Sequence, residues 1–163
     1  METDTYYFFW KHRLSQWHMV DFVVDGMTFC CTEQYMMYKK ALLFDDKLTA
    51  LKILATRNPR DHQTLGRSVK NFDQKIWDAN KRQIVLEGNF HRFSQSKPCR
   101  ELLFSTGNKI LVEASPYDKV WGIGLAEADP LALNESTWRG QNLLGKVLTD
   151  VREILITKEE YPE

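Results

Sequence analysis

Residues 32–41 read TEQYMMYKKA and predict a helix that carries a carboxylate and an amine on one face. Glu33 and Lys40 are seven positions apart, which is nearly two helical turns, so their side chains project from the same side. The neighbouring residues are mostly bulky and apolar or aromatic. Burial at such a face disfavours both charges, whereas their mutual attraction favours them. The pair is therefore a candidate for acid, base or covalent chemistry, although an exposed pair that only stabilises the helix would show the same spacing.

The length and charge of the chain limit the classes of protein to consider. With 163 residues, we expect a single domain over residues 1–163, with a substantial core. Lys and Arg together number 22, as do Asp and Glu, so the formal net charge is zero. A protein that follows a nucleic-acid backbone is normally basic, so a nucleotide or nucleic-acid substrate would have to be held by a local site.

Cysteine content and hydropathy predict a cytoplasmic protein with no membrane contact. Cys30, Cys31 and Cys99 are an odd number, and two of them are adjacent, which argues against a disulfide framework and suits a reducing compartment. No basic segment is followed by the apolar run of a signal peptide. The apolar stretches are also too short to span a bilayer.

The pattern of apolar residues and turn signals predicts a helix-rich α+β domain with a few short strands. Short strands are expected at residues 6–10, 109–113 and 119–123, and a hairpin at residues 20–31 around Asp25-Gly26. Helices are expected at 33–44 with Thr32 as cap, at 46–55, and towards residue 65 from Asn58-Pro59. Further helices should run from Asp73 towards 93, from 96 to 107, and through the apolar repeat at 144–155, where Gly145 should permit close packing.

Two further segments combine residue types that suit a ligand. Residues 115–125, SPYDKVWGIGL, offer Trp121 as a stacking surface, Asp118 as an acceptor for a hydroxyl group and Gly122 for close backbone approach. A strand with a bulge and a core Trp is the simpler interpretation of that segment. Residues 138–145, WRGQNLLG, place Arg139 before a helix N-terminus that could receive phosphate; an ordinary helix cap at Asn142 is equally compatible.

The sequence gives no indication of a metal or cofactor site. The four histidines show no ligand spacing, and the adjacent pair Cys30-Cys31 is not a zinc half-site. Walker and nucleophile-elbow motifs are absent. We therefore expect no metal ligands and no cofactor.

Taken in order along the chain, these segments resemble the NADAR family, also called YbiA-like, from about Tyr6 to Leu155. Besides the helix from Glu33 to Lys40, the matching motifs are LSQW at 14–17, VDGMTF at 24–29, GR at 66–67, Trp77, STG at 105–107, LVEASP at 111–116, DKVWGIGL at 118–125 and WRGQNLLG at 138–145. Two positions depart from the family pattern. Ile123 stands where some members carry an acidic residue, and Gln34 stands where His is frequent.

The resemblance implies the YbiA-like fold and an N-glycosidase that cleaves the bond between a ribose C1 and a nitrogen. Two substrate types are associated with the family: ADP-ribose attached to guanine bases, and phosphorylated early intermediates of riboflavin synthesis. We expect the first, with the modified base in a nucleoside or at a DNA or RNA end. No obligate protein partner is implied.

The resemblance also assigns roles to residues. It places the family's functional Glu at Glu33 and its helix Lys at Lys40, and we add Asp118 to this catalytic set. Glu33 would stabilise positive charge at C1 or position a water, and Lys40 would act as a cation or as a Schiff-base nucleophile. The predicted substrate contacts are Trp77, Trp121, Gly122, Tyr35, Arg67, Arg139 and Asn142. A non-catalytic module that binds ADP-ribose or another nucleotide remains the alternative, and it would not need Glu33.

Overall fold

The structure is a computed structural model and describes residues 1–162. Its contacts divide the chain into two compact units: unit 1 is formed by Met1–Ser15 and Lys97–Glu163, and unit 2 by Gln16–Ser96. Across the described residues, α-helices predominate and the strands have three or four residues each, so the predicted helix-rich α+β class is confirmed. None of the helices within residues 1–162 is both long and apolar enough to cross a bilayer.

Unit 2 begins with a β-hairpin, as predicted. Strands β2 (Phe22–Val24) and β3 (Met27–Phe29) pair antiparallel, with Phe22 opposite Phe29. The connecting residues Asp25 and Gly26 have positive φ angles of 50° and 79°. Asp and Gly tolerate this conformation, which matches the right-handed twist of the two strands.

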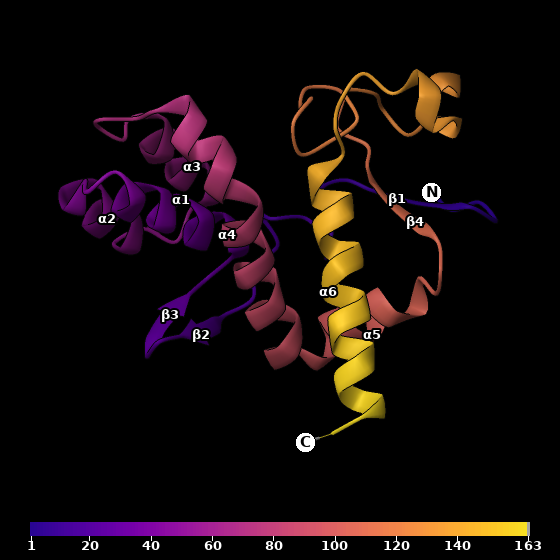
Figure 1. The fold of residues 1–163 in the computed structure, drawn as a ribbon, viewed down its shortest axis with the longest axis horizontal. Coiled ribbons are helices and arrows are strands. Elements are labelled where there is room, and N and C mark those ends of the chain that lie inside the picture. The colour runs from indigo at the N-terminus through magenta and orange to yellow at the C-terminus, as the bar shows by residue number, and fades with distance from the viewer. Residues whose placement is uncertain (163) are drawn as a thin grey trace. The chain divides into compact units, whose positions relative to one another are not determined.

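The rest of unit 2 consists of helices packed around α1 (Figure 1). Helix α1 (Thr32–Leu43) contacts α2 (Lys47–Leu54), α3 (Pro59–Arg67) and α4 (Gln74–Gln95). The predicted cap Asn58 accepts a backbone N–H in the first turn of α3. Asp46 and Asp73, at the expected starts of α2 and α4, accept backbone N–H groups of their helices in the same way. The prediction that Thr32 caps α1 was wrong by one residue. Cys31 is the cap residue, and the Thr32 hydroxyl donates to the carbonyl oxygen of Gln16 at 3.2 Å.

Unit 1 contains a two-stranded parallel sheet, formed by strands far apart in the chain. Strand β1 (Tyr6–Phe9) pairs with β4 (Ile110–Glu113), with Tyr6 opposite Ile110. Helix α5 (Lys97–Ser105) precedes β4, and helix α6 (Leu143–Glu160) packs against both β4 and α5 (Figure 1). Gly145 allows the approach of α6 to β4, because a Cβ atom there would collide with the carbonyl oxygen of Leu111.

The strand predicted at residues 119–123 is a loop, so that prediction was wrong. Its carbonyl groups accept hydrogen bonds from the segment that leads into α6, rather than from a neighbouring strand. The Arg139 N–H donates to Ile123 at 2.9 Å, and the Asn142 N–H donates to Gly122 at 3.0 Å. Two short 3₁₀ helices, η1 (Pro130–Leu133) and η2 (Glu135–Thr137), lie between these loop segments in the chain.

Candidate active site

Glu33 lies in the first turn of α1 and is almost completely buried. Only 4% of its surface is exposed, and its backbone N–H donates to the carbonyl oxygen of Gln16 at 3.0 Å. The N-terminus of a helix carries partial positive charge, so this position stabilises a carboxylate. The fold therefore holds an acidic side chain in a protected and electrostatically favourable position.

Lys40 lies in the last turn of the same helix and is half-buried. Its Nζ atom is 4.7 Å from the ring centroid of Phe72 and 5.4 Å from that of Trp77. Aromatic faces attract cations, so both rings help to position the amine. Burial lowers the pKa of Lys40; the charge of Glu33 raises it, and the charge of Arg67 lowers it further. The pKa of the Lys40 amine therefore depends on the charges of Glu33 and Arg67.

Trp77 and Arg67 come from two different helices that pack against α1. Trp77 lies in the first turns of α4 and is 8% exposed, whereas Arg67 ends α3 and is exposed. A Cβ atom at Gly66 would collide with the side chain of Met37, so the glycine beside Arg67 lets α3 approach α1 closely. Unit 2 therefore gathers Lys40, Trp77 and the charges of Glu33 and Arg67 around one face of α1.

Phe72 belongs to this cluster but was missed by the sequence analysis. It lies between α3 and α4, directly before the cap Asp73, and is 42% exposed. Its ring also contacts that of Phe44, at a centroid distance of 5.3 Å. An exposed aromatic residue just ahead of the helix that carries Trp77 is a weak signal, but it is one that the sequence contains.

Tyr35, predicted to contact substrate, lies in the core of unit 2. Its ring centroid is 5.1 Å from that of Phe29, and a Cβ atom at Gly88 would lie 2.6 Å from the ring. The Tyr35 hydroxyl donates to Glu87 Oε2 at 3.2 Å. Burial, with the nearby Glu87 charge, raises the pKa of Tyr35, so the side chain is a neutral hydrogen-bond donor. These contacts describe a packing role that couples α1 to the hairpin and to α4.

Asp118, Trp121 and Gly122 share one loop of unit 1. Asp118 Oδ1 accepts the backbone N–H groups of Val120 and Trp121, both at 2.8 Å. Trp121 is half-buried, and a Cβ atom at Gly122 would lie 2.9 Å from the carbonyl oxygens of Asp118 and Glu113. Asp118 therefore shapes the turn that presents Trp121, and the loop conformation requires glycine at position 122.

Arg139 and Asn142 lie on the segment that enters α6. Arg139 is exposed, whereas Asn142 is 2% exposed and adopts a left-handed conformation with φ of 52°. The Asn142 side chain donates to the Leu111 carbonyl at 2.9 Å and accepts the Glu113 N–H at 3.0 Å. It makes no side-chain cap bond to α6, so its contacts join the segment to β4.

The N-terminus of α6 does not match the predicted phosphate-binding arrangement. Its first two backbone N–H groups, at Leu143 and Leu144, donate to the carbonyl oxygens of Val120 at 3.2 Å and Trp121 at 3.1 Å. These are donors that an anion at a helix N-terminus would use. The loop therefore satisfies them, and only the Arg139 side chain keeps the predicted potential for phosphate.

A cavity of about 310 Å³ lies elsewhere in unit 1. It is lined by Met1, Phe8, Phe9, Trp10, His12, Ala114, Ala126, Glu127 and Ala128. That lining includes none of the predicted site residues. The catalytic assignment therefore depends on the side chains that lie around α1 and not on this cavity.

One cluster of potential metal ligands was not anticipated from the sequence. Cys30, Cys31 and His62 place their donor atoms within 4.8 Å of one another in unit 2. His62 lies in α3, far along the chain from the cysteine pair, so no short-range ligand spacing could indicate it.

Comparison with known proteins agrees with the fold. The NADAR domain profile matches residues 8–156. The NMR structure of the E. coli protein YbiA superimposes with a TM-score of 0.81 at 24% identity, covering all of this chain and 92% of that one. The helix-rich α+β architecture is therefore shared with YbiA.

Several relatives carry descriptive names. N-glycosidase R617 of Acanthamoeba polyphaga mimivirus is 45% identical, over 94% of this chain and 98% of its own length. N-glycosidase Npun_R5314 of Nostoc punctiforme is 34% identical, over 74% of this chain and 70% of its own. The maize riboflavin biosynthesis protein PYRR is 30% identical over 82% of this chain, which corresponds to only 21% of PYRR.

The two N-glycosidase names support a hydrolase that acts on N-glycosyl bonds. The family profile spans nearly the whole chain, including the Glu33–Lys40 helix and the loops around Trp121 and Arg139. The chain therefore belongs to the NADAR family.

Proposed function

We propose that this protein is an N-glycosidase that removes ADP-ribose from guanine bases by hydrolysing the ribose C1–N bond. The observation that carries the proposal is the arrangement on α1: a carboxylate that is 4% exposed, followed seven residues later by an amine whose pKa is lowered by burial. Charged groups in such environments are characteristic of catalytic sites. The N-glycosidase names of two relatives support the same reaction class.

Glu33 is the proposed electrostatic and general-base residue. When the C1–N bond breaks, positive charge develops at C1 and the ring oxygen, and the base leaves with the bonding electrons and takes up a proton. A nearby carboxylate lowers the energy of that charge and can orient the water that adds a hydroxyl group to C1. Its buried position strengthens this interaction, because little solvent screens it.

Lys40 has two proposed roles, which differ in whether its amine is charged or neutral. As a cation, it would hold a substrate phosphate or pair with Glu33. As a neutral amine, it would form a bond to C1 as the base departs; ring opening would then give a Schiff base, and water would release the sugar and restore the amine. The lowered pKa increases the neutral fraction that the second role needs. Borohydride reduction during turnover should leave sugar-derived mass on Lys40 only in the second case.

The remaining predicted residues are proposed as substrate contacts. Trp77 and Trp121 would stack on the base or the adenine, and Arg67 and Arg139 would face phosphate. Asp118 and Gly122 would act by shaping the loop that presents Trp121, which their contacts support. Asn142 and Tyr35 would support the site through packing, given their burial.

A second candidate substrate is a phosphorylated early intermediate of riboflavin synthesis, which the similarity to maize PYRR favours. Both candidates present a ribose C1–N bond, so the same α1 residues would serve. The deciding experiment incubates the protein separately with ADP-ribosylated guanosine, ADP-ribosylated DNA and the phosphorylated pyrimidine intermediate. Free ADP-ribose from the first two supports the proposal; ribose phosphate from the third alone would replace it with the second candidate.

Binding without cleavage is the third possibility, and one variant distinguishes it. Glu33→Gln preserves the size of the side chain but removes its charge. If the protein is an enzyme, this variant should still bind ADP-ribosyl-guanosine and should lose turnover. A wild-type protein that binds all of these compounds and releases no product from any of them would show a binding module instead.

A further inference from the structure

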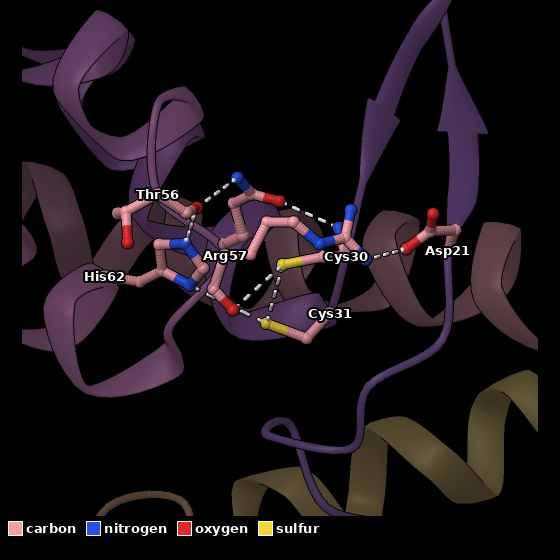
Figure 2. Close-up of polar contacts among 7 residues, drawn as sticks. Asp21, Cys30, Cys31, Thr56, Arg57 and His62 are labelled. Atoms are coloured by element: carbon pink, nitrogen blue, oxygen red, sulfur yellow. Dashed lines mark hydrogen bonds and ion pairs between the residues drawn. The ribbon is translucent and has the colours of Figure 1, made fainter.

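Three soft or borderline donor atoms meet beside the start of α1 (Figure 2). Cys31 Sγ lies 3.7 Å from His62 Nδ1 and 4.0 Å from Cys30 Sγ. Cys30 is 1% exposed, and Cys31 and His62 are fully buried. Two adjacent thiols and an imidazole are thus enclosed together, although the proposed glycosidase chemistry uses none of them.

The hydrogen bond between His62 and Thr56 fixes which ring nitrogen carries the proton, and so which one has a free lone pair on the cysteines' side. His62 Nε2 lies 2.7 Å from the carbonyl oxygen of Thr56, so Nε2 must carry the proton, because a carbonyl oxygen only accepts. Nδ1 then presents its lone pair towards Cys31 (Figure 2). Histidines that bind metals usually donate their second N–H to such a carbonyl or to a carboxylate, which fixes the ring orientation.

The separations also suit one tetrahedral ion. With Zn–S bonds of about 2.3 Å and Zn–N bonds of about 2.0–2.1 Å, tetrahedral angles place two sulfurs about 3.8 Å apart and a sulfur and a nitrogen about 3.6 Å apart. Two of the separations in the structure, 4.0 Å and 3.7 Å, need only a small contraction, and all three donor atoms lie within 4.8 Å of one another. The geometry points to a zinc site formed by Cys30, Cys31 and His62.

The donor set also matches zinc in charge and chemical character. Two thiolates and a neutral imidazole balance the double positive charge, which matters in a buried position where an unbalanced charge is costly. Binding forms two Zn–S bonds and one Zn–N bond, and releases the two thiol protons to solvent. Cys30 Sγ donates to the Arg57 carbonyl oxygen at 3.7 Å, a hydrogen bond that is lost when the thiol gives up its proton to bind the ion.

A structural role follows from where the ligands lie. The cysteines end the segment after β3, and Cys31 caps α1, whereas His62 belongs to α3. An ion would therefore cross-link the start of the helix that carries Glu33 to a neighbouring helix. Because the unfolded chain lacks this arrangement, zinc should stabilise the folded protein by mass action.

Cobalt provides a direct spectroscopic test, because tetrahedral Co²⁺ bound to thiolate gives intense visible bands and a near-ultraviolet charge-transfer band. We expect the full-length, reduced protein to develop both under oxygen-free conditions, saturating at one equivalent, with Zn²⁺ displacing the cobalt. Cys31→Ser and His62→Gln should lose or greatly weaken the bands. The matched controls Cys99→Ser and His91→Gln, which remove a buried thiol and an imidazole elsewhere, should keep them.

Two further measurements on the wild-type protein do not depend on the folding of any variant. One equivalent of Zn²⁺ should raise Tm, and calorimetry in buffers of different ionisation enthalpy should show two protons released per ion. Absence of the thiolate charge-transfer band in folded, reduced wild-type protein would overturn the site. Cobalt bands that persist in both Cys31→Ser and His62→Gln would also overturn the site. Zinc binding without proton release would overturn it too. That last outcome would instead indicate ordinary surface binding.

Discussion

Lys40 Nζ lies 5.4 Å from the ring centroid of Trp77, which brings together two residues from different helices that the sequence had singled out separately. Phe72 approaches the same amine more closely, at 4.7 Å. The result is an amine held between solvent and aromatic rings on the helix that also carries Glu33. This environment leads to predictions that distinguish a reactive amine from a structural cation.

The first prediction concerns the pH dependence set by Lys40. The positive charge of Arg67 helps to lower the pKa of Lys40 below its ordinary value of 10.5, so Arg67→Gln should raise that pKa. If neutral Lys40 is the nucleophile, kcat rises with pH through this pKa, and the rising limb should move to higher pH in Arg67→Gln. If the cation is required, kcat falls with pH, and the falling limb should move in the same direction.

Arg60→Gln is the matched control, because it removes another exposed arginine from α3. Its pH–rate profile should overlay that of the wild type. A profile of Arg67→Gln that also overlays the wild type would show that Lys40 does not control either limb.

The second prediction separates stacking from packing at the two tryptophans. Trp121 is half-buried, so Trp121→Ala should weaken ligand binding by roughly 1–3 kcal/mol if it stacks on a base, and Trp121→Phe should recover much of the loss. Trp77, also proposed to stack on substrate, is only 8% exposed, so Trp77→Ala should in addition reduce the free energy of unfolding by about 3–5 kcal/mol. Calorimetric binding and urea unfolding on both variants test the distinction; unchanged binding by Trp121→Ala would remove that residue from the substrate contacts.

The third prediction is that catalysis does not require a metal ion. The developing charge on the sugar is positive, and a carboxylate can offset it without a Lewis acid. Prolonged treatment with a chelator should therefore leave kcat unchanged well below Tm, even if loss of zinc from the cysteine–histidine cluster lowers Tm. If chelation abolished kcat and one specific metal restored it, Glu33 would have to be reconsidered as a possible ligand.

The fourth prediction tests the structural role of Asn142. Its amide group donates to Leu111 and accepts from Glu113 in a buried position. Asn142→Asp keeps the acceptor and tolerates the left-handed backbone, but it places a carboxylate oxygen against a carbonyl oxygen. We expect a loss of about 1–3 kcal/mol in the free energy of unfolding. Gln141→Glu, the same change at an exposed neighbour, should have little effect.

Local signals predicted most of the fold. Asp46, Asn58 and Asp73 marked helix starts because a side-chain cap depends only on a few neighbouring residues, and Asp25-Gly26 marked the hairpin for the same reason. The pairing of β1 with β4 could not be predicted in this way, because the whole of unit 2 separates the two strands in the chain. The loop at 119–123 was mistaken for a strand because its hydrogen-bond partners lie in another loop.

In the candidate site, too, the features set by neighbouring residues could be predicted, whereas those set by contacts between distant residues could not. Helical periodicity was enough to place Glu33 and Lys40 on one face, and the coupling of their charges agrees with it. Phe72 and His62 were overlooked because their importance depends on contacts made after folding. The anion site considered at α6 also depends on contacts made after folding, since carbonyl groups of Val120 and Trp121 accept the N–H groups of Leu143 and Leu144.

The most direct test of the central claim is single-turnover hydrolysis of ADP-ribosyl-guanosine by the wild type and Glu33→Gln, with the free energy of unfolding measured on both. We predict that the wild type releases free ADP-ribose, and that the variant remains folded, binds the substrate and turns over at least about 100-fold more slowly, as expected for loss of a positioned catalytic carboxylate. A folded Glu33→Gln protein that releases ADP-ribose at nearly the wild-type rate would contradict the account.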